Sequence, residues 1–246
     1  MTVMMLIIIG GIGFATCDDI RVNRFHIKKY RMQSKVIICT TAFLIALPAL
    51  YIFFCEFGER PIAERIWSSL FQSVTPRTAG FNTADLTMLS ETGLALIVIL
   101  MLVGGSPGST AGGMKTTTFA VLLSTAISVF RRREHTQFFG RRIPEDTVRN
   151  AATILTMYLT MFLGGGFLIS RMEGIPLLTC LFETASAVGT VGLSLGITPK
   201  LGLASHVILI ILMYFGRVGG LTLVFAAVSS RKGNTARLPQ EKMMVG

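Results

Sequence analysis

The sequence predicts an all-helical membrane protein built from repeated units of a full helix, a half-length helix and a second full helix. Three observations support this fold class. The 246 residues are 51% hydrophobic and only 15% charged, with a mean hydropathy of +0.64, whereas soluble domains carry about 25% charged residues. The apolar residues form long runs separated by short basic blocks. Two stretches, 70–82 and 181–194, resemble one another, which indicates an internal repeat.

The apolar runs predict membrane spans, since a helix needs about 20 apolar residues to cross the hydrocarbon of a bilayer. The tail of one span is predicted at Met4–Phe14 and a complete span at Lys35–Phe54. Leu94–Phe130 is long enough to cross but is interrupted by a Gly-rich stretch. Val148–Ser170 and Leu203–Ser229 predict two further spans.

Two shorter apolar stretches lie between these spans, at Ile62–Gln72 and Pro176–Thr184. At roughly ten residues, each would form about 15 Å of helix, which is half of the hydrocarbon thickness. We therefore expect each stretch to enter the membrane and to return on the side from which it came.

Basic blocks between the apolar runs predict the orientation of the chain. Residues 21–35 hold six Lys or Arg residues and no acidic residue, and 131–142 hold five Arg against one Glu. By the positive-inside rule these blocks are expected in the cytoplasm, as is the basic tail from Arg231 to Lys242. The sequence thus predicts a multi-pass protein of the cell membrane with a cytoplasmic C-terminus, whose half-length segments enter from outside.

The positions of the charges also decide between classes of partner. A net charge of +10 is typical of nucleic-acid binding proteins, but basic residues grouped at the ends of apolar runs indicate topology. We therefore expect a lipid bilayer, and no nucleic acid, as partner.

The four cysteines form no CxxC pair or Cys/His cluster, and no nucleophile, base and orienting group stand at catalytic spacing. The sequence therefore predicts no resident metal, no cofactor and no enzymatic activity.

The internal repeat is clearest where two loops follow the half-length segments. LFQSVTPRTAGFN at 70–82 aligns with LFETASAVGTVGLS at 181–194 after one insertion, and both contain Thr-x-Gly. The following helices align at the same 112-residue offset, ILMLVGG at 99–105 with ILMYFGR at 211–217. MLIIIGG at 5–11 is a third copy of that helix. The repeated unit is therefore complete twice and present once as its last third.

This repeated unit indicates an ion pore. Non-helical backbone is tolerated at membrane depth only where protein or water covers it, because each unpaired C=O or N–H group there costs several kcal/mol. A half-length helix that returns as an extended Thr-x-Gly loop can aim carbonyl oxygens at a cation that has lost its water. Gly permits the required backbone angles, and Thr can add a hydroxyl ligand. Either loop alone would also fit an ordinary tight turn, but two aligned copies favour the pore.

The stretch GGSPGSTAGGMK at 104–115 interrupts an apolar run. Its glycines have the spacing of a phosphate-binding loop, but Met114 displaces Lys115 and Thr116 by one position, so nucleotide binding is not expected. Leu94–Val103 would form about 15 Å of helix, which places the break near the middle of the bilayer. Five Gly and one Pro make a continuous helix there costly. We expect an intramembrane loop; a Gly-rich kink that allows close helix packing is the alternative.

Four motifs resemble those of the bacterial Ktr/Trk family of potassium uptake proteins, most of all its Ktr membrane subunits. The motifs are VTPRTAGFNT, GGSPGSTAGGMKTTTFA, AVGTVGLSLGI and GRVGGLT, which occur in family order and at family spacing. The resemblance implies a potassium-channel type of fold, with four linked helix, pore-helix, helix repeats around one pore. In that scheme, 1–34 is the end of the second helix of repeat two plus a cytoplasmic linker, 35–142 is repeat three and 143–246 is repeat four.

The resemblance also implies roles for particular residues. The ion-binding filter positions would be Thr78, Ala79 and Gly80 in repeat three, and Thr190, Val191 and Gly192 in repeat four. An intramembrane loop with an arginine beside it would form the gate. The gate residues are Gly104, Gly105, Ser106, Pro107, Gly108, Ser109, Thr110, Ala111, Gly112, Gly113 and Arg217.

The function implied by the resemblance is potassium uptake, with K⁺ as the substrate and a sodium effect on uptake. The implied assembly is a homodimer of membrane subunits on a cytoplasmic ring of nucleotide-binding RCK proteins. Because repeat one and the filter of repeat two are not present, we expect this chain to be a partial gene product or to have a misassigned start. The alternative function is therefore a non-conducting fragment.

Two charged residues leave alternatives open. Arg217 is predicted near mid-membrane, where a charge costs at least about 2.5–3.5 kcal/mol and needs a partner. Carbonyl groups of the Gly-rich loop are the expected partner, and extension of the side chain to an interface is the alternative. Glu183 lies on the second half-length helix, either as a buried polar anchor or as a charge that acts on the ion path.

Overall fold

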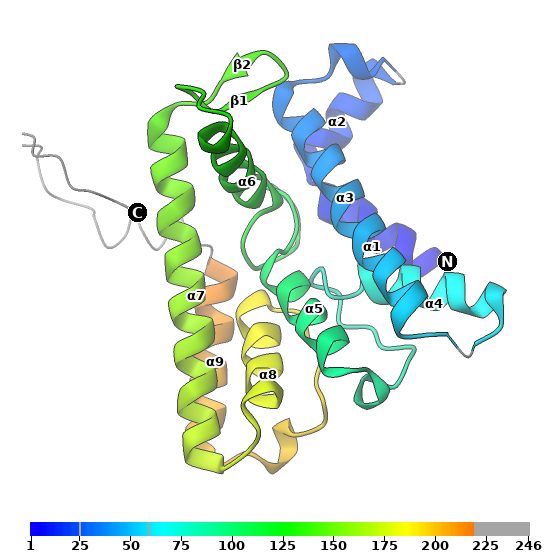
Figure 1. Cartoon of the computed structure of the whole chain (residues 1–246), viewed down its shortest axis with the longest axis vertical. Coiled ribbons are helices and arrows are strands. Elements are labelled where there is room, and N and C mark those ends of the chain that lie inside the picture. Colours follow the sequence, from blue (N-terminus) through cyan, green and yellow to red (C-terminus); the bar gives the residue numbers. More distant parts are fainter. Residues whose placement is uncertain (25, 59, 219–246) are drawn as a thin grey trace, which may run out of the picture.

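The computed structural model describes residues 1–24, 26–58 and 60–218, which are mostly helical (Figure 1). The predicted all-helical class is confirmed, apart from one short hairpin. The end of the predicted last span, to Ser229, and the basic tail from Arg231 to Lys242 lie outside the described residues.

The N-terminal segment differs from its prediction. Helix α1 (Thr2–Ile12) is followed at once by α2 (Phe14–Asn23), and the two axes differ by 98°. The bend is at Gly13, whose φ of 88° lies in the region that favours glycine. The predicted span tail at Met4–Phe14 therefore contains a sharp bend, and the chain continues beyond it as a second helix that ends at Asn23. A short 3₁₀ helix, η1 (Ile27–Lys29), follows.

In the part of the chain that the structure describes, two helices have the length and composition of complete spans. They are α3 (Met32–Cys55), which contains Pro48, and α7 (Glu145–Glu173). Within the described residues, the bent pair of α1 and α2 would add a third span if it is counted as one. Helix α7 ends where Gly174 adopts a left-handed conformation, a common way to end a helix.

The half-length segments are both helices of 13 residues, α4 (Ile62–Val74) and α8 (Leu177–Gly189). Each begins directly after a proline, which is favoured near a helix start because it lacks the N–H that would be unpaired there. At about 1.5 Å per residue, each is roughly 20 Å long. Both continue further than predicted and end next to the Thr-x-Gly loops.

The long predicted span is broken, as expected, into α5 (Glu91–Leu102) and α6 (Thr116–Phe130). Ser90 caps α5 by accepting a hydrogen bond from the Gly93 N–H. The remaining elements are the 3₁₀ helices η2 (Leu86–Met88) and η3 (Thr198–Lys200), and α9 (Leu203–Val218), the last described helix.

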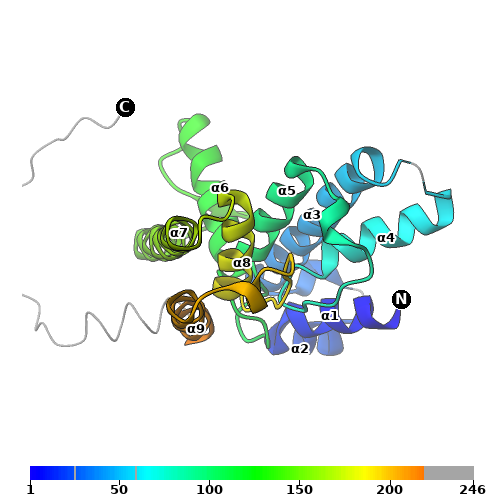
Figure 2. The same cartoon turned by 90° about the horizontal axis from the view of Figure 1, so that it is seen from below.

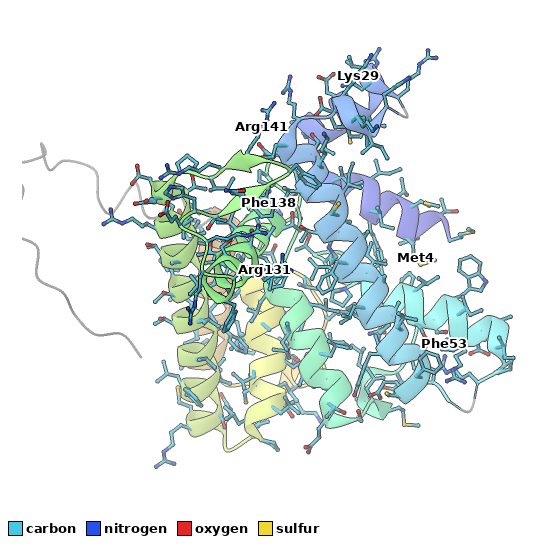
Figure 3. The ribbon with its side chains drawn as sticks, turned by 45° about the horizontal axis from the view of Figure 1, so that its top comes forward. Met4, Lys29, Phe53, Arg131, Phe138 and Arg141 are labelled. Atoms are coloured by element: carbon cyan, nitrogen blue, oxygen red, sulfur yellow. The ribbon has the colours of Figure 1, made fainter. Side chains whose placement is uncertain are left out.

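The Arg-rich block contains a hairpin that the sequence did not predict. Strands β1 (Gln137–Phe138) and β2 (Arg141–Arg142) pair around Phe139 and Gly140, whose φ values are 47° and 76°. Two successive positive φ values are typical of a tight hairpin turn. The Lys35 ammonium lies 5.9 Å from the centre of the Phe139 ring. Figure 3 places Lys29 and Arg141 toward the same end of the molecule, so the two predicted cytoplasmic blocks lie together.

Helix α8 lies at the centre of the packing. It packs against α5, α7 and α9 (Figure 2), and Phe182, Ala185 and Val188 on it are fully buried. Helices α3 and α4 pack together on the other side of α5 (Figure 1). Outward side chains such as Phe54 and Phe167 are large, apolar and exposed. Such a surface suits contact with lipid. The interior of the helical packing positions the two Thr-x-Gly loops next to α5.

Candidate functional site

The two Thr-x-Gly loops have the same unusual backbone. Thr78 and Thr190 have φ values of 63° and 50°, and Gly80 and Gly192 have φ values of 69° and 94°. A threonine with positive φ is a genuine outlier because its branched side chain is crowded there. Backbone outliers of this kind cluster at functional sites. The sequence repeat is therefore also a repeat of backbone conformation.

The loops lie against each other although 112 residues separate them. A Cβ atom on Gly80 would overlap the carbonyl oxygen of Val191 and lie 3.2 Å from the Cα of Gly192. Position 80 must therefore be glycine for two reasons, its positive φ and the backbone of the other loop.

Hydroxyl residues at equivalent positions of the two half-length helices hold the loops. The Thr75 carbonyl accepts hydrogen bonds from the N–H groups of Ala79 (3.2 Å) and Gly80 (3.3 Å), and its hydroxyl donates to the Phe81 carbonyl. The Ser186 carbonyl accepts from Val191 N–H at 2.8 Å, and its hydroxyl accepts from Gly192 N–H at 3.1 Å. The end of each helix thus fixes the loop that follows it.

The Gly-rich loop is closed at its base. The Gly104 N–H donates to the Met114 carbonyl at 2.9 Å, and the Thr116 N–H donates to the Gly105 carbonyl at 3.0 Å. The hydroxyls of Ser106 and Thr116, both fully buried, are 3.0 Å apart. These bonds satisfy backbone groups that the break between α5 and α6 would otherwise leave unpaired. Residues 104–113 therefore form a closed loop, which we call the projection, and not the simple kink considered as the alternative.

The projection contacts both Thr-x-Gly loops. A Cβ atom on Gly112 would overlap the Thr190 hydroxyl, and one on Gly104 would lie 3.4 Å from the Thr78 methyl group. Gly113 lies against Gly189 at the end of α8, where a Cβ would be 3.4 Å from its Cα. The structure thus brings the predicted gate residues directly beside the threonines of both predicted filter loops.

Two cationic side chains hold the tip of the projection. The Arg217 guanidinium donates to the Thr110 carbonyl at 2.8 Å, and the Lys115 ammonium donates to the Ala111 carbonyl at 2.6 Å. The expected partner of Arg217 is therefore the one that the structure shows. Lys115 stands before the first residue of α6, as expected for a helix start, and its bond back to the loop was not predicted.

A cavity of about 340 Å³ extends from the first Thr-x-Gly loop to this tip. It is lined by α1 residues, among them Ile7 and Gly10, together with Thr78, Ala79 and Thr110. A second cavity, of about 400 Å³, lies beside Thr190–Ser194 and α9. Each of the two Thr-x-Gly loops therefore borders a cavity.

Comparison with known proteins decides the family. Residues 1–236 match the model of the TrkH family, which is described as a cation transport protein. This chain belongs to the TrkH family.

Curated relatives of this TrkH-family chain include the Ktr system potassium uptake protein B of Bacillus subtilis. It is 36% identical over 252 residues, which cover 100% of this chain and 56% of the relative. The potassium/sodium uptake protein NtpJ of Enterococcus hirae is 37% identical, over 100% of this chain and 57% of its own length. The chain therefore spans about half the length of the curated relatives it matches. The family is one of transporters, which is not an enzyme class.

The crystal structure of the potassium transporter TrkH from Vibrio parahaemolyticus shares the fold of this chain. The TM-score is 0.74 at 20% sequence identity, and the match covers 92% of this chain and 51% of that one. The predicted class of helical membrane protein is thereby confirmed. The division into repeats at 34 and 142, and the roles of the filter and gate residues, stay predictions.

Glu183 of this TrkH-family chain is an anchor. It is 5% exposed, and its carboxylate accepts hydrogen bonds from the Ser194 hydroxyl (2.6 Å), the Leu195 N–H (3.0 Å) and the Thr198 hydroxyl (2.8 Å). These donors belong to the segment that follows the second Thr-x-Gly loop. Of the two alternatives left open by the sequence, the buried anchor is the one that the contacts support.

Sequence reasoning missed two buried polar residues beside the first loop. Gln72, at the position that matches Glu183, is fully buried, and neither polar atom of its side chain has a hydrogen-bond partner in the described part of the chain. Arg77 precedes Thr78 and is 5% exposed, and its guanidinium is 3.5 Å from the Thr41 hydroxyl. An arginine within an apolar repeat was the signal that could have identified it.

Glu183→Ala is expected to destabilise the chain by at least about 2 kcal/mol, because each buried donor left without a partner costs about 1–3 kcal/mol. The matched control is Gln72→Leu at the equivalent position, which removes no hydrogen bond and is expected to leave stability unchanged or higher. Thermal unfolding in one detergent measures both. Equal losses of stability in the two variants would contradict the anchoring role of Glu183.

Proposed function

We propose that this chain forms the pathway-lining part of a potassium uptake subunit. In this proposal, K⁺ that has lost its water passes the backbone carbonyls of Thr78–Gly80 and Thr190–Gly192, and residues 104–113 close the path beside the two threonines. The observation that carries the proposal is the shared positive-φ conformation of two loops that meet each other and the Gly-rich projection.

The backbone geometry supports ion coordination in a specific way. Alternating positive and negative φ values turn successive carbonyl groups toward the same side of a strand, and such carbonyl rows replace the water around a cation. The half-length helices α4 and α8 end at these loops, so the negative ends of their dipoles lie near the ion path. Both features favour a cation and disfavour an anion.

The names of the relatives support the ion of the proposal and a system of more than one component. The names of the Bacillus subtilis and Enterococcus hirae relatives describe potassium uptake by a Ktr system and potassium/sodium uptake. We therefore propose K⁺ as the substrate and Na⁺ as a coupling or activating ion. From the motif resemblance we propose a homodimer on a cytoplasmic RCK ring as the assembly. The C-terminus is proposed to be cytoplasmic, on the same side of the membrane as the basic blocks.

The proposal is tested with a chimera in which this chain replaces the matching 56% of the Bacillus subtilis relative. In a bacterial strain that lacks its own potassium uptake, the chimera is expected to restore growth at low potassium and rubidium uptake. A chimera that reaches the membrane in normal amounts but restores neither would contradict the proposed function. The chain expressed alone tests the alternative of a non-conducting fragment, which predicts no restored growth.

A further inference from the structure

The bend between α1 and α2 contacts the Gly-rich projection at three consecutive places. The Ser106 N–H donates to the Gly11 carbonyl at 2.9 Å, and the Phe14 N–H donates to the Gly108 carbonyl at 3.2 Å. Between these two bonds, a Cβ atom on Gly13 would lie 2.5 Å from the Pro107 carbonyl oxygen. The projection therefore fits into the bend with no space for an added side chain.

Helix physics explains why these contacts are strong. The end of α1 leaves carbonyl groups without a partner within the helix, and the start of α2 leaves N–H groups without one. At membrane depth, unpaired backbone groups cost several kcal/mol each. The projection supplies one donor to the first helix end and one acceptor to the second. If the projection moved away, Gly11 and Phe14 would each lose a backbone partner.

The far end of α2 is fixed to the next helix. Asp19 on α2 is 5% exposed and accepts hydrogen bonds from the Ser34 hydroxyl (2.6 Å) and the Arg31 N–H (3.1 Å) at the start of α3. Helix α2 thus connects the predicted cytoplasmic linker to the projection. A change in the angle at Gly13 would change the position of the atoms that hold the loop.

We propose that the α1–α2 bend is a gate-positioning element, which holds the loop at 104–113 in its closed position through Gly11, Gly13 and Phe14. Opening of the loop then requires a change of the bend, and the contacts of Asp19 with Arg31 and Ser34 are the place from which such a change is transmitted. The proposal rests on the proposed function, in which this loop is the gate. It adds a second support to the loop, at residues 106–108, whereas Arg217 holds the Thr110 carbonyl.

Phe14 offers a substitution that removes a single hydrogen-bond donor. Proline lacks an N–H but is tolerated at the first position of a helix, which Phe14 occupies in α2. Phe14→Pro therefore removes the donor to the Gly108 carbonyl, whereas Phe14→Ala keeps it and loses the same ring, which is mostly exposed. Comparison of the two variants isolates the backbone bond.

The readout is the reaction rate of a cysteine on the loop, Ser109→Cys, with a membrane-impermeant thiol reagent. The four native cysteines are replaced, and the whole chain is held in lipid nanodiscs. Phe14→Pro is expected to react roughly threefold to tenfold faster than Phe14→Ala, the factor that corresponds to one lost hydrogen bond. Equal rates in the two variants would overturn the proposal.

A second pair of variants keeps the test valid if Phe14→Pro does not fold. Gly13→Ala introduces a Cβ against the Pro107 carbonyl, whereas Gly11→Ala, two residues earlier, meets no atom within 4 Å. Faster labelling in Gly13→Ala only is expected, and equal labelling contradicts the proposal. These rates do not depend on transport. Faster labelling together with a chimera that fails to transport would support the positioning role of the bend and reject the loop as the gate of a transporter. Equal labelling together with a chimera that transports would reject the positioning role and leave the proposed function intact.

Discussion

Replacing Gly80 with Ala is expected to abolish rubidium uptake by the chimera. A Cβ atom at this position overlaps the Val191 carbonyl oxygen and lies 3.2 Å from the Gly192 Cα, so one of the two loops must move. Overpacking of this kind costs about 1–3 kcal/mol, and it acts on the carbonyl groups proposed to bind the ion. Uptake at matched amounts of protein in the membrane measures the effect.

The control for Gly80→Ala is Gly174→Ala. The φ values of the two glycines are 69° and 68°, so alanine has an unfavourable φ at both positions. A Cβ on Gly174 meets no atom within 4 Å. Uptake that survives in Gly174→Ala and is lost in Gly80→Ala assigns the effect to contact between the loops. Loss of uptake in both variants, or in neither, would argue against a filter formed by these loops.

Replacing Arg217 with Ala is expected to release the tip of the projection. The guanidinium is the donor to the Thr110 carbonyl, and hydrogen bonds to charged groups contribute about 1.5–3 kcal/mol. The open form should therefore rise roughly 10-fold to 100-fold. The labelling rate of Ser109→Cys in nanodiscs measures the loop, and potassium leakage from cells with the chimera measures the path.

Arg171→Ala is the control, since Arg171 also stands in the last turn of a helix, α7, away from the projection. It is expected to label at the same rate as the parent chain. Arg217→Lys keeps the positive charge but replaces the planar guanidinium with a compact ammonium on a shorter side chain. The labelling rate of this variant is expected to lie between those of the parent chain and Arg217→Ala. An unchanged rate and unchanged leakage in Arg217→Ala would contradict the view that Arg217 holds the tip of the projection.

Much of the secondary structure could be predicted from the sequence because it depends on neighbouring residues. Apolar runs marked α3 and α7, short runs marked α4 and α8, and the Gly and Pro residues of 104–113 marked the break between α5 and α6. The repeat alignment also paired Thr78 with Thr190, which the structure shows in matching conformations. Helix ends were less accurate, since α8 continues to Gly189 under cover of its neighbours.

Other features could not be predicted because no local pattern encodes them. MLIIIGGIGF is as typical of a continuous helix as of the 98° bend at Gly13, and an Arg-rich block is as typical of an open linker as of a hairpin. The anchoring role of Glu183 became clear only when its donors, at Ser194 and beyond, were located. The same is true of the burial of Gln72 and Arg77.

The sequence by itself determined the class of protein, the positions of α3 to α8 along the chain, and the residues of the two Thr-x-Gly loops and the projection. Hydrophobic transfer and backbone propensity act over neighbouring residues, so these features are present in the linear order. Only the tertiary structure decided that Gly80 lies on Val191, that Arg217 binds Thr110, and that the bend at Gly13 holds the projection. These contacts join residues that are about one hundred apart, and they depend on which backbone groups at membrane depth remain to be paired once the helices have packed.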